Sequence, residues 1–112
     1  VKGKSFPTFN PMGPVVVTKD EFDPADVNLW TKVDGASRQN SSTKDLIFNV
    51  DHIVWYVSQC MELFPGDIIN TGTPEGVAAG MKPPAFLTVG QHVTTGIAGI
   101  GEQSSKVIAY NA

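Results

Sequence analysis

The sequence is poor in cysteine, in positive charge and in long apolar runs, and each shortage excludes a class of protein. Its single cysteine, Cys60, excludes an internal disulfide framework and favours a reducing compartment, so we expect a cytoplasmic protein. Eight basic against eleven acidic residues give a net charge of −3, which argues against a nucleic-acid partner. No apolar run approaches the length of about 18 residues that a transmembrane helix needs, so no membrane partner is predicted.

The chain is also short of leucine, and its apolar residues favour strands over helices. Val and Ile together number 20 against 4 Leu, and β-branched side chains fit a pleated sheet well. Gly and Pro together number 19, which predicts frequent turns. The 112 residues suffice for one small domain, but the first residue is Val1 and not Met. We therefore expect residues 1–112 to be a single partial domain, incomplete at the amino end or trimmed.

A β-hairpin over residues 28–40 is the best-defined local structure that the sequence predicts. Residues 28–33 alternate partly between apolar and polar side chains. Asp34-Gly35 then supplies a two-residue type I′ turn, after which residues 36–40 run back.

One helix is predicted downstream of the hairpin. Apolar residues recur with helical spacing from Ile53 to Met61, and Asn49 or Asp51 is a suitable cap. Pro65-Gly66 then ends the helix. Cys60 lies on the apolar stripe and has no basic neighbour, so we expect an inert thiol in the core.

Shorter strands complete the predicted fold. Val15–Val17 is expected as a short buried strand, Ile68–Ile69 as the start of another strand, and residues 72–84 as a loop rich in Gly and Pro. The tail beyond Gln91 is expected to form two or more strands joined by glycine turns. The predicted class is β-rich α+β, with one helix packed on the strands.

The sequence contains few residues that could hold a metal ion or perform nucleophilic catalysis. His52 and His92 are far apart, and there is no His-x-His, Glu-x-Glu or pair of cysteines. The carboxylates that remain are dispersed. We therefore predict no metal ligands in this chain, whereas a Ser-His-Asp arrangement stays open even though no nucleophile elbow is present.

Two polar stretches have both a functional and a purely structural interpretation. Gly3 to Thr8 could direct the Lys4 ammonium into a pocket with the Thr8 hydroxyl nearby, or Lys4 could be a solvated surface residue. Asn70 to Gly76 follows a predicted strand and offers two threonine hydroxyls and backbone N–H groups. Such a loop suits a carboxylate or carbonyl oxygen, or it is an ordinary connection whose threonines satisfy the local backbone. The residues alone leave both stretches open.

The order and spacing of several short motifs resemble the carboxy-terminal half of the fumarylacetoacetate hydrolase family, from Lys4 to about Val107. The run at residues 81–84 is most similar to bacterial members that act on diketo or 2-oxo acids. The motifs are Lys4-Ser5-Phe6-Pro7-Thr8-Phe9, Pro11-Met12-Gly13-Pro14, Leu29-Trp30-x-Lys32-Val33-x-Gly35, Arg38-Gln39-x-x-x-Thr43, Ile47-Phe48, Pro65-Gly66-Asp67-Ile68-Ile69, Thr71-Gly72-Thr73-Pro74-x-Gly76-Val77 and Met81-Lys82-Pro83-Pro84.

The resemblance implies a mixed β-roll, usually dimeric, that uses Mg²⁺ or Mn²⁺ to bind a small-molecule substrate with adjacent carboxylate and oxo groups. The implied reaction is hydrolysis of a C–C bond in a β-diketo or 2-oxo acid of the fumarylacetoacetate or acylpyruvate type. Two alternatives are a 2-oxo-dienoate isomerase or decarboxylase of the same family, and a non-catalytic β-roll scaffold or assembly subunit.

The resemblance also implies roles for individual residues. Lys4 matches the family lysine that stabilises an oxyanion beside the metal, with Thr8 near it, and both are assigned as catalytic. Thr73 matches the threonine that contacts the acid end of the substrate, with Thr71 and Gly72 around it. The family's metal carboxylates and its acid–base histidine precede the lysine motif, so the metal ligands are expected upstream of Val1. The expected assembly is a homodimer, or a pairing with a chain that carries the amino-terminal segment.

Overall fold

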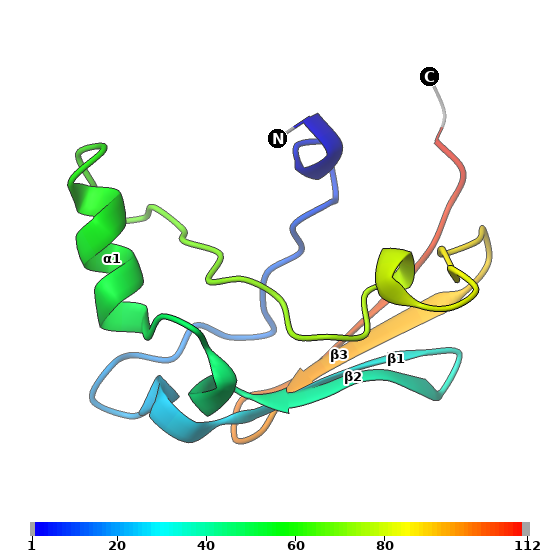
Figure 1. Cartoon of the computed structure of the whole chain (residues 1–112), viewed down its shortest axis with the longest axis horizontal. Helices are drawn as coiled ribbons and strands as arrows, with labels where there is room; N and C mark the ends of the chain where they lie inside the picture. The colour runs from blue at the N-terminus through cyan, green and yellow to red at the C-terminus, as the bar shows by residue number, and fades with distance from the viewer. Residues whose placement is uncertain (1, 111–112) are drawn as a thin grey trace.

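A four-stranded antiparallel sheet with the order β2-β1-β3-β4 forms the centre of the molecule. The structure is a computed structural model and describes residues 2–110. The strands are β1 (Asn28–Val33), β2 (Ala36–Ser42), β3 (His92–Ile97) and β4 (Gly101–Lys106). The only α-helix of the described residues, α1 (Val50–Ser58), lies to one side of the sheet (Figure 1). The predicted β-rich α+β class is confirmed.

The β1–β2 hairpin has the predicted turn. Asp34 and Gly35 have φ angles of 49° and 81°, and this left-handed pair is the type I′ turn that Asp-Gly favours. The Asp34 carboxylate accepts a hydrogen bond from the His92 backbone N–H at 2.8 Å, so the turn is also attached to the start of β3. The hairpin prediction is therefore confirmed.

A β-bulge interrupts the hairpin next to its turn. Thr31 pairs with Gln39 and Lys32 pairs with Ser37, which leaves Arg38 as an extra residue in β2. A bulge bends the strand that contains it and redirects the side chains around it. Arg38 and Gln39 are the residues redirected here.

The β3–β4 hairpin confirms the predicted strands of the tail. Gly96 of β3 pairs with Trp30 of β1, and a Cβ added at Gly96 would collide with the Trp30 indole. The indole therefore covers the glycine across the strand pair, which explains why a residue without a side chain stands inside β3.

The helix is confirmed, but it is shorter than predicted. The Asn49 side chain caps α1 by accepting a hydrogen bond from the His52 backbone N–H at 2.8 Å. The helix ends at Ser58, so Cys60 and Met61 lie beyond it. Cys60 is exposed, and its predicted place in the core is wrong. The periodicity correctly marked an apolar face, but no residue of α1 is fully buried, and Ile53 and Val57 on that face are half-buried.

Two predicted strands are absent from the described residues. Val15–Val17 and Ile68–Ile69 run through the structure without strand pairing, and those two predictions are wrong. A strand needs a neighbour that accepts and donates its backbone hydrogen bonds. Neither segment has such a neighbour between residues 2 and 110.

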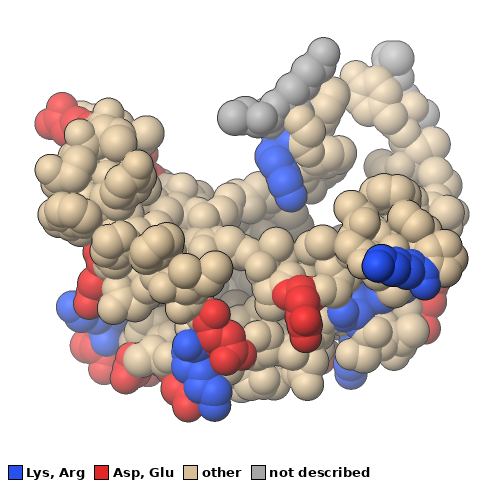
Figure 2. Space-filling view, viewed as in Figure 1, with Lys and Arg blue, Asp and Glu red and all other residues tan. Residues whose placement is uncertain are grey.

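The chain exposes more surface than a folded protein of the same mass, and many large apolar side chains are exposed. Its accessible area is 9019 Å², whereas a folded protein of 12.0 kDa exposes about 6,000 Å². Among the residues that the structure describes, only Val27 and Val33 have buried apolar side chains. Figure 2 shows a deep concavity between the helical side of the molecule and the rest of the chain, bordered mainly by uncharged atoms. Exposed large apolar residues include Val16, Ile47, Phe48, Trp55, Phe64 and Phe86.

Among residues 2–110, no helix has the length and apolar character that crossing a membrane requires.

Candidate functional site

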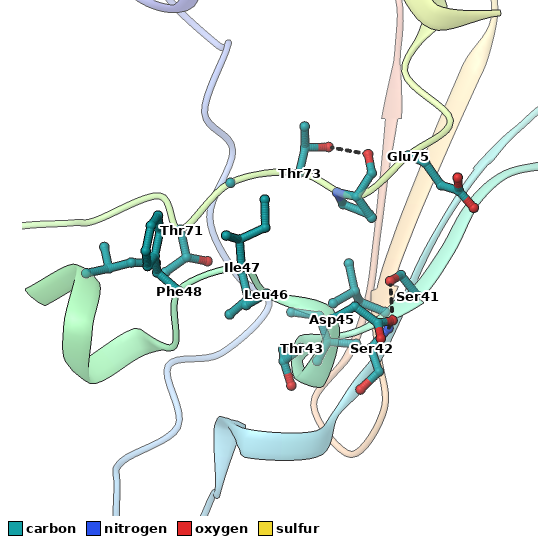
Figure 3. Close-up of a pocket in the computed structure, with 15 residues that line it drawn as sticks. Ser41, Ser42, Thr43, Asp45, Leu46, Ile47, Phe48, Thr71, Thr73 and Glu75 are labelled. Carbon is teal, nitrogen blue, oxygen red and sulfur yellow. Dashed lines mark hydrogen bonds between the residues drawn. The ribbon is translucent and has the colours of Figure 1, made fainter.

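A cleft of about 790 Å³ lies where the end of β2 faces the loop that follows residue 70 (Figure 3). Its volume is in the range of small-molecule binding sites. The sheet, the short helix η3 (Thr43–Asp45), the start of α1 and the loop all contribute to the wall. The lining residues are Leu29, Ser41, Ser42, Thr43, Asp45, Leu46, Ile47, Phe48, Ile53, Thr71, Gly72, Thr73, Pro74, Glu75 and Ile97.

Asp45 is fixed in the wall of the cleft by the cap of η3. Its carboxylate accepts hydrogen bonds from the Ser41 hydroxyl at 2.9 Å and from the Ser42 backbone N–H at 3.2 Å. The Ser42 hydroxyl in turn accepts from the Lys44 backbone N–H at 3.2 Å, which completes a capping box. The Ser41 hydroxyl, followed by the Ser42 N–H, lowers the pKa of Asp45 below its ordinary value of 3.8. Asp45 is therefore a fixed negative charge at neutral pH.

The loop that holds Thr71, Gly72 and Thr73 is the donor-rich edge of the cleft. The three residues line it together. Their backbone N–H groups donate no hydrogen bond to any other backbone group of residues 2–110. Free N–H groups beside threonine hydroxyls suit the oxygens of a carboxylate or an oxo group.

Gln39 attaches this loop to β2, and the sequence analysis missed that contact. Its side-chain nitrogen Nε2 donates to Thr73 Oγ1 at 2.9 Å, to the Pro74 carbonyl at 3.0 Å and to the Glu75 carbonyl at 3.2 Å. Gly76 then passes so close to the Arg38 carbonyl that a Cβ would collide with it. Gln39 belongs to a motif that carried the family resemblance, but no local pattern gave it a role, because its partners are more than 30 residues away.

Lys4 and Thr8 lie outside the set of cleft-lining residues. Both are exposed, and Lys4 ends the single-turn helix η1 (Lys2–Lys4). Thr8 has a φ of 70°, a left-handed conformation that β-branched residues rarely adopt. The catalytic roles of Lys4 and Thr8 therefore stay predictions.

The charge of the cleft wall is negative. The lining residues include Asp45 and Glu75 but no Lys, Arg or His. A substrate carboxylate in this cleft would therefore need hydroxyl and N–H donors, together with a cation that comes from elsewhere.

The described residues do not form a metal site by themselves. Between residues 2 and 110, no three His, Cys, Asp or Glu side chains converge as ligands for a metal ion. A divalent cation such as Mg²⁺ needs its carboxylate, water and substrate oxygens at the corners of one octahedron. Asp45 and Glu75, the acidic residues of the cleft wall, belong to no such convergent group among the described residues.

The fold and the loop sequence define the class of protein. Residues 1–108 match the fumarylacetoacetate (FAA) hydrolase C-terminal family. The chain belongs to this family.

Individual relatives share much of this chain and are much longer. A Burkholderia ambifaria protein with only a general hydrolase designation is 54% identical over 104 residues, which are 91% of this chain and 37% of that protein. The chain thus spans little more than a third of the length of the relative. The structure of a fumarylacetoacetate hydrolase from Exiguobacterium antarcticum matches with a TM-score of 0.93 and 49% identity, over 97% of this chain and 39% of that one. This match confirms the predicted family fold.

Two further solved structures carry different activities in their names. A maleylpyruvate hydrolase from a Sphingobium species, in complex with manganese(II) and pyruvate, is 35% identical with a TM-score of 0.80 and covers 90% of this chain and 36% of its own. A 5-carboxymethyl-2-hydroxymuconate delta-isomerase from Mycobacterium smegmatis is 39% identical with a TM-score of 0.84, over 96% of this chain and 39% of its own. The family thus includes both hydrolases and isomerases.

Proposed function

We propose that this chain is the carboxy-terminal part of the catalytic domain of a metal-dependent enzyme that hydrolyses a C–C bond in a β-diketo or 2-oxo acid. The observation that carries the proposal is the donor-rich edge at Thr71–Thr73, which lines a cleft of small-molecule size. Pyruvate, which is bound in the Sphingobium relative, has the adjacent carboxylate and oxo groups that such an edge would recognise.

In this proposal, one group of residues binds the substrate and another stabilises the negative charge that develops during the reaction. Thr73, with Thr71 and Gly72 beside it, binds the acid end of the substrate through hydroxyl and N–H donors. Lys4 places an ammonium group beside the oxygen that becomes negative when the C–C bond breaks, and Thr8 assists it. The absence of any cation among the cleft-lining residues supports a role for a lysine from another segment.

The metal in this proposal is Mg²⁺ or Mn²⁺, and its ligands come from polypeptide other than residues 2–110. Two observations support this assignment. The described residues have no convergent ligand set, and the Sphingobium relative, which is much longer than this chain, is in complex with manganese(II).

The assembly in this proposal is a homodimer, or a complex with a chain that carries the amino-terminal segment. The exposed surface supports it, because an accessible area of 9019 Å² exceeds the value expected for a folded protein of this mass by about half.

The location in this proposal is the cytoplasm, which the single free cysteine supports.

A chimera tests this function. The part of the E. antarcticum protein that matches this chain is replaced by residues 1–112, and the purified chimera is assayed with an acylpyruvate and Mg²⁺ or Mn²⁺. We expect cleavage into two acids. Lys4→Ala is expected to lower kcat by about 100-fold or more with a much smaller change in KM, as for the loss of one oxyanion donor. A Lys4→Ala chimera as active as its parent would contradict the role of Lys4.

Isomerisation or decarboxylation of a 2-oxo-dienoate is the second candidate, and the likeness to the M. smegmatis isomerase favours keeping it. Mass spectrometry of the products separates the reactions. Hydrolysis adds the elements of water and yields two acids, isomerisation leaves the mass unchanged, and decarboxylation releases CO₂. A folded chimera that binds pyruvate but converts none of these substrates would instead indicate a non-catalytic scaffold.

A further inference from the structure

We infer that Gln39 is a positioning residue that makes the Thr73 hydroxyl a hydrogen-bond donor toward the cleft. This inference rests on the substrate-binding role proposed for Thr73. Gln39 Nε2 lies 2.9 Å from Thr73 Oγ1. An amide nitrogen only donates, so the Thr73 oxygen must accept this hydrogen bond. The single proton of the Thr73 hydroxyl is then left for another acceptor.

The orientation of the Gln39 amide is fixed by two backbone carbonyls. Nε2 lies 3.0 Å from the Pro74 oxygen and 3.2 Å from the Glu75 oxygen. A flipped amide would place Oε1 against two carbonyl oxygens that cannot donate, so both of those hydrogen bonds would be lost and only the Thr73 hydroxyl could still donate to it. Gln39 therefore presents an N–H group, and never its oxygen, to Thr73.

Among residues 2–110, the Thr73 proton has only a weak acceptor. Thr73 Oγ1 lies 3.4 Å from the Pro74 carbonyl, well beyond the usual distance of about 2.8 Å for an O–H···O hydrogen bond. The Gln39 amide already supplies that carbonyl with a shorter hydrogen bond. A substrate carboxylate is a stronger acceptor than a carbonyl, so the proton turns to it when the cleft is filled.

The bulge in β2 explains how Gln39 reaches the loop. In a regular strand, neighbouring side chains point to opposite faces. Here Arg38 Nη1 contacts Met81 Sδ at 3.0 Å, while Gln39 contacts Thr73, so both side chains reach the connection between α1 and β3. The extra residue at Arg38 makes this possible. Gly76, which passes against the Arg38 carbonyl, brings the loop close enough.

Two substitutions of Gln39 separate positioning from simple packing. Gln39→Met keeps the length of the side chain and removes the amide, so the Thr73 hydroxyl loses the donor that orients it. Gln39→Glu keeps the shape, but the carboxylate accepts the Thr73 proton and removes it from the substrate. Protonation of that carboxyl restores a donor, so the defect of Gln39→Glu is expected to shrink as the pH falls from 7 to 4, through the ordinary glutamic acid pKa of about 4.3. A merely structural defect would not follow pH in this way.

The experiment measures the Kd of pyruvate by calorimetry for the chimera described above, with Mn²⁺ present. Thr73→Val and Gln39→Met are each expected to raise Kd about tenfold, the usual worth of one hydrogen bond to a charged group. The double variant is expected to be no weaker than either single variant, because both remove the same donor. Gln103→Met is the matched control. The Gln103 amide also donates to a backbone carbonyl, that of Gly13, but Gln103 lies outside the cleft wall. The Kd of pyruvate for the Gln103→Met variant is therefore expected to stay within twofold of the parent value.

Two results would overturn the inference, and they differ in what they say of the proposed function. If Thr73→Val weakens pyruvate binding and Gln39→Met does not, Gln39 does not act through Thr73, and the role of Thr73 stands. If neither variant changes Kd, Thr73 does not bind the acid end, and the proposed function loses its main support.

Discussion

The sheet and the segments around it differ in strand pairing and in the burial of their apolar side chains. The four strands pair in one antiparallel sheet that is interrupted only by the bulge at Arg38. Of the two buried valines, Val33 lies in β1 and Val27 immediately precedes it. In contrast, α1 has no buried residue, and the extended segments before β1 and after α1 make no strand pairs. The comparison shows that two local hairpins specify the sheet, whereas the outer segments leave large apolar side chains exposed.

We expect the largest loss of stability from a substitution at Gly76, where the loop contacts β2. Gly76 and Gly90 both have a φ of 97°, but only at Gly76 would a Cβ meet other atoms, those of the Arg38 carbonyl and Gln39. We expect Gly76→Ala to cost about 3 kcal/mol in free energy of unfolding, since strain and collision add, and Gly90→Ala about 1 kcal/mol. Urea denaturation of the chimera measures both. Equal losses would mean that the loop does not rest on β2.

Valine truncations compare the two regions directly. Val33 is 6% exposed in the sheet and Val16 is 83% exposed in the amino-terminal segment. In the isolated chain, Val33→Ala is expected to lower the free energy of unfolding by about 2 kcal/mol, and Val16→Ala by less than about 0.5 kcal/mol. Urea denaturation followed by circular dichroism measures the difference. A larger loss at Val16 would reverse the comparison.

The aromatic surface of α1 should gain importance when other polypeptide covers it. Trp55 is 57% exposed in the chain described here. We expect Trp55→Ala to change the unfolding free energy of the isolated chain by less than about 0.5 kcal/mol and that of the chimera by about 1.5 kcal/mol. Thermal or urea unfolding of the two pairs gives the comparison. The same small effect in both would show that this face stays in solvent.

The smallest expected effect concerns the cap of η3. Hydrogen bonds from Ser41 and Ser42 lower the pKa of Asp45 in the folded chain. The associated stability is therefore present above the unfolded pKa of about 3.8 and is lost as the pH falls through the lower, folded value. Ser41→Ala should move the Asp45 pKa upward, toward the unfolded value, as measured by carboxyl carbon chemical shifts during a pH titration. An unchanged midpoint would show that the Ser41 hydroxyl does not bind the carboxylate in solution.

The sequence predictions succeeded for features that depend on residues adjacent in the chain and failed for the segments outside the sheet. The Asp34-Gly35 turn and the Asn49 cap were predictable because each depends on residues that are adjacent in the chain. The predicted strands at Val15–Val17 and Ile68–Ile69 and the predicted burial of Cys60 were wrong. Apolar residues predict burial, but they do not supply the surface that buries them. Thr71, Gly72 and Thr73 were singled out through the family resemblance; they line one cleft, and their substrate-binding role stays a prediction. Gln39 was missed, because a bulge and a distant loop together create its contacts.

The central claim is that the Thr71–Thr73 edge of the cleft binds the acid end of a 2-oxo acid. A crystal structure of the chimera with Mn²⁺ and pyruvate tests it most directly. We expect a pyruvate carboxylate oxygen within about 3 Å of Thr73 Oγ1, with Gln39 Nε2 still bound to the other side of that hydroxyl. Pyruvate bound with its carboxylate away from this edge, and the Thr73 hydroxyl still turned to the Pro74 carbonyl, would contradict the claim.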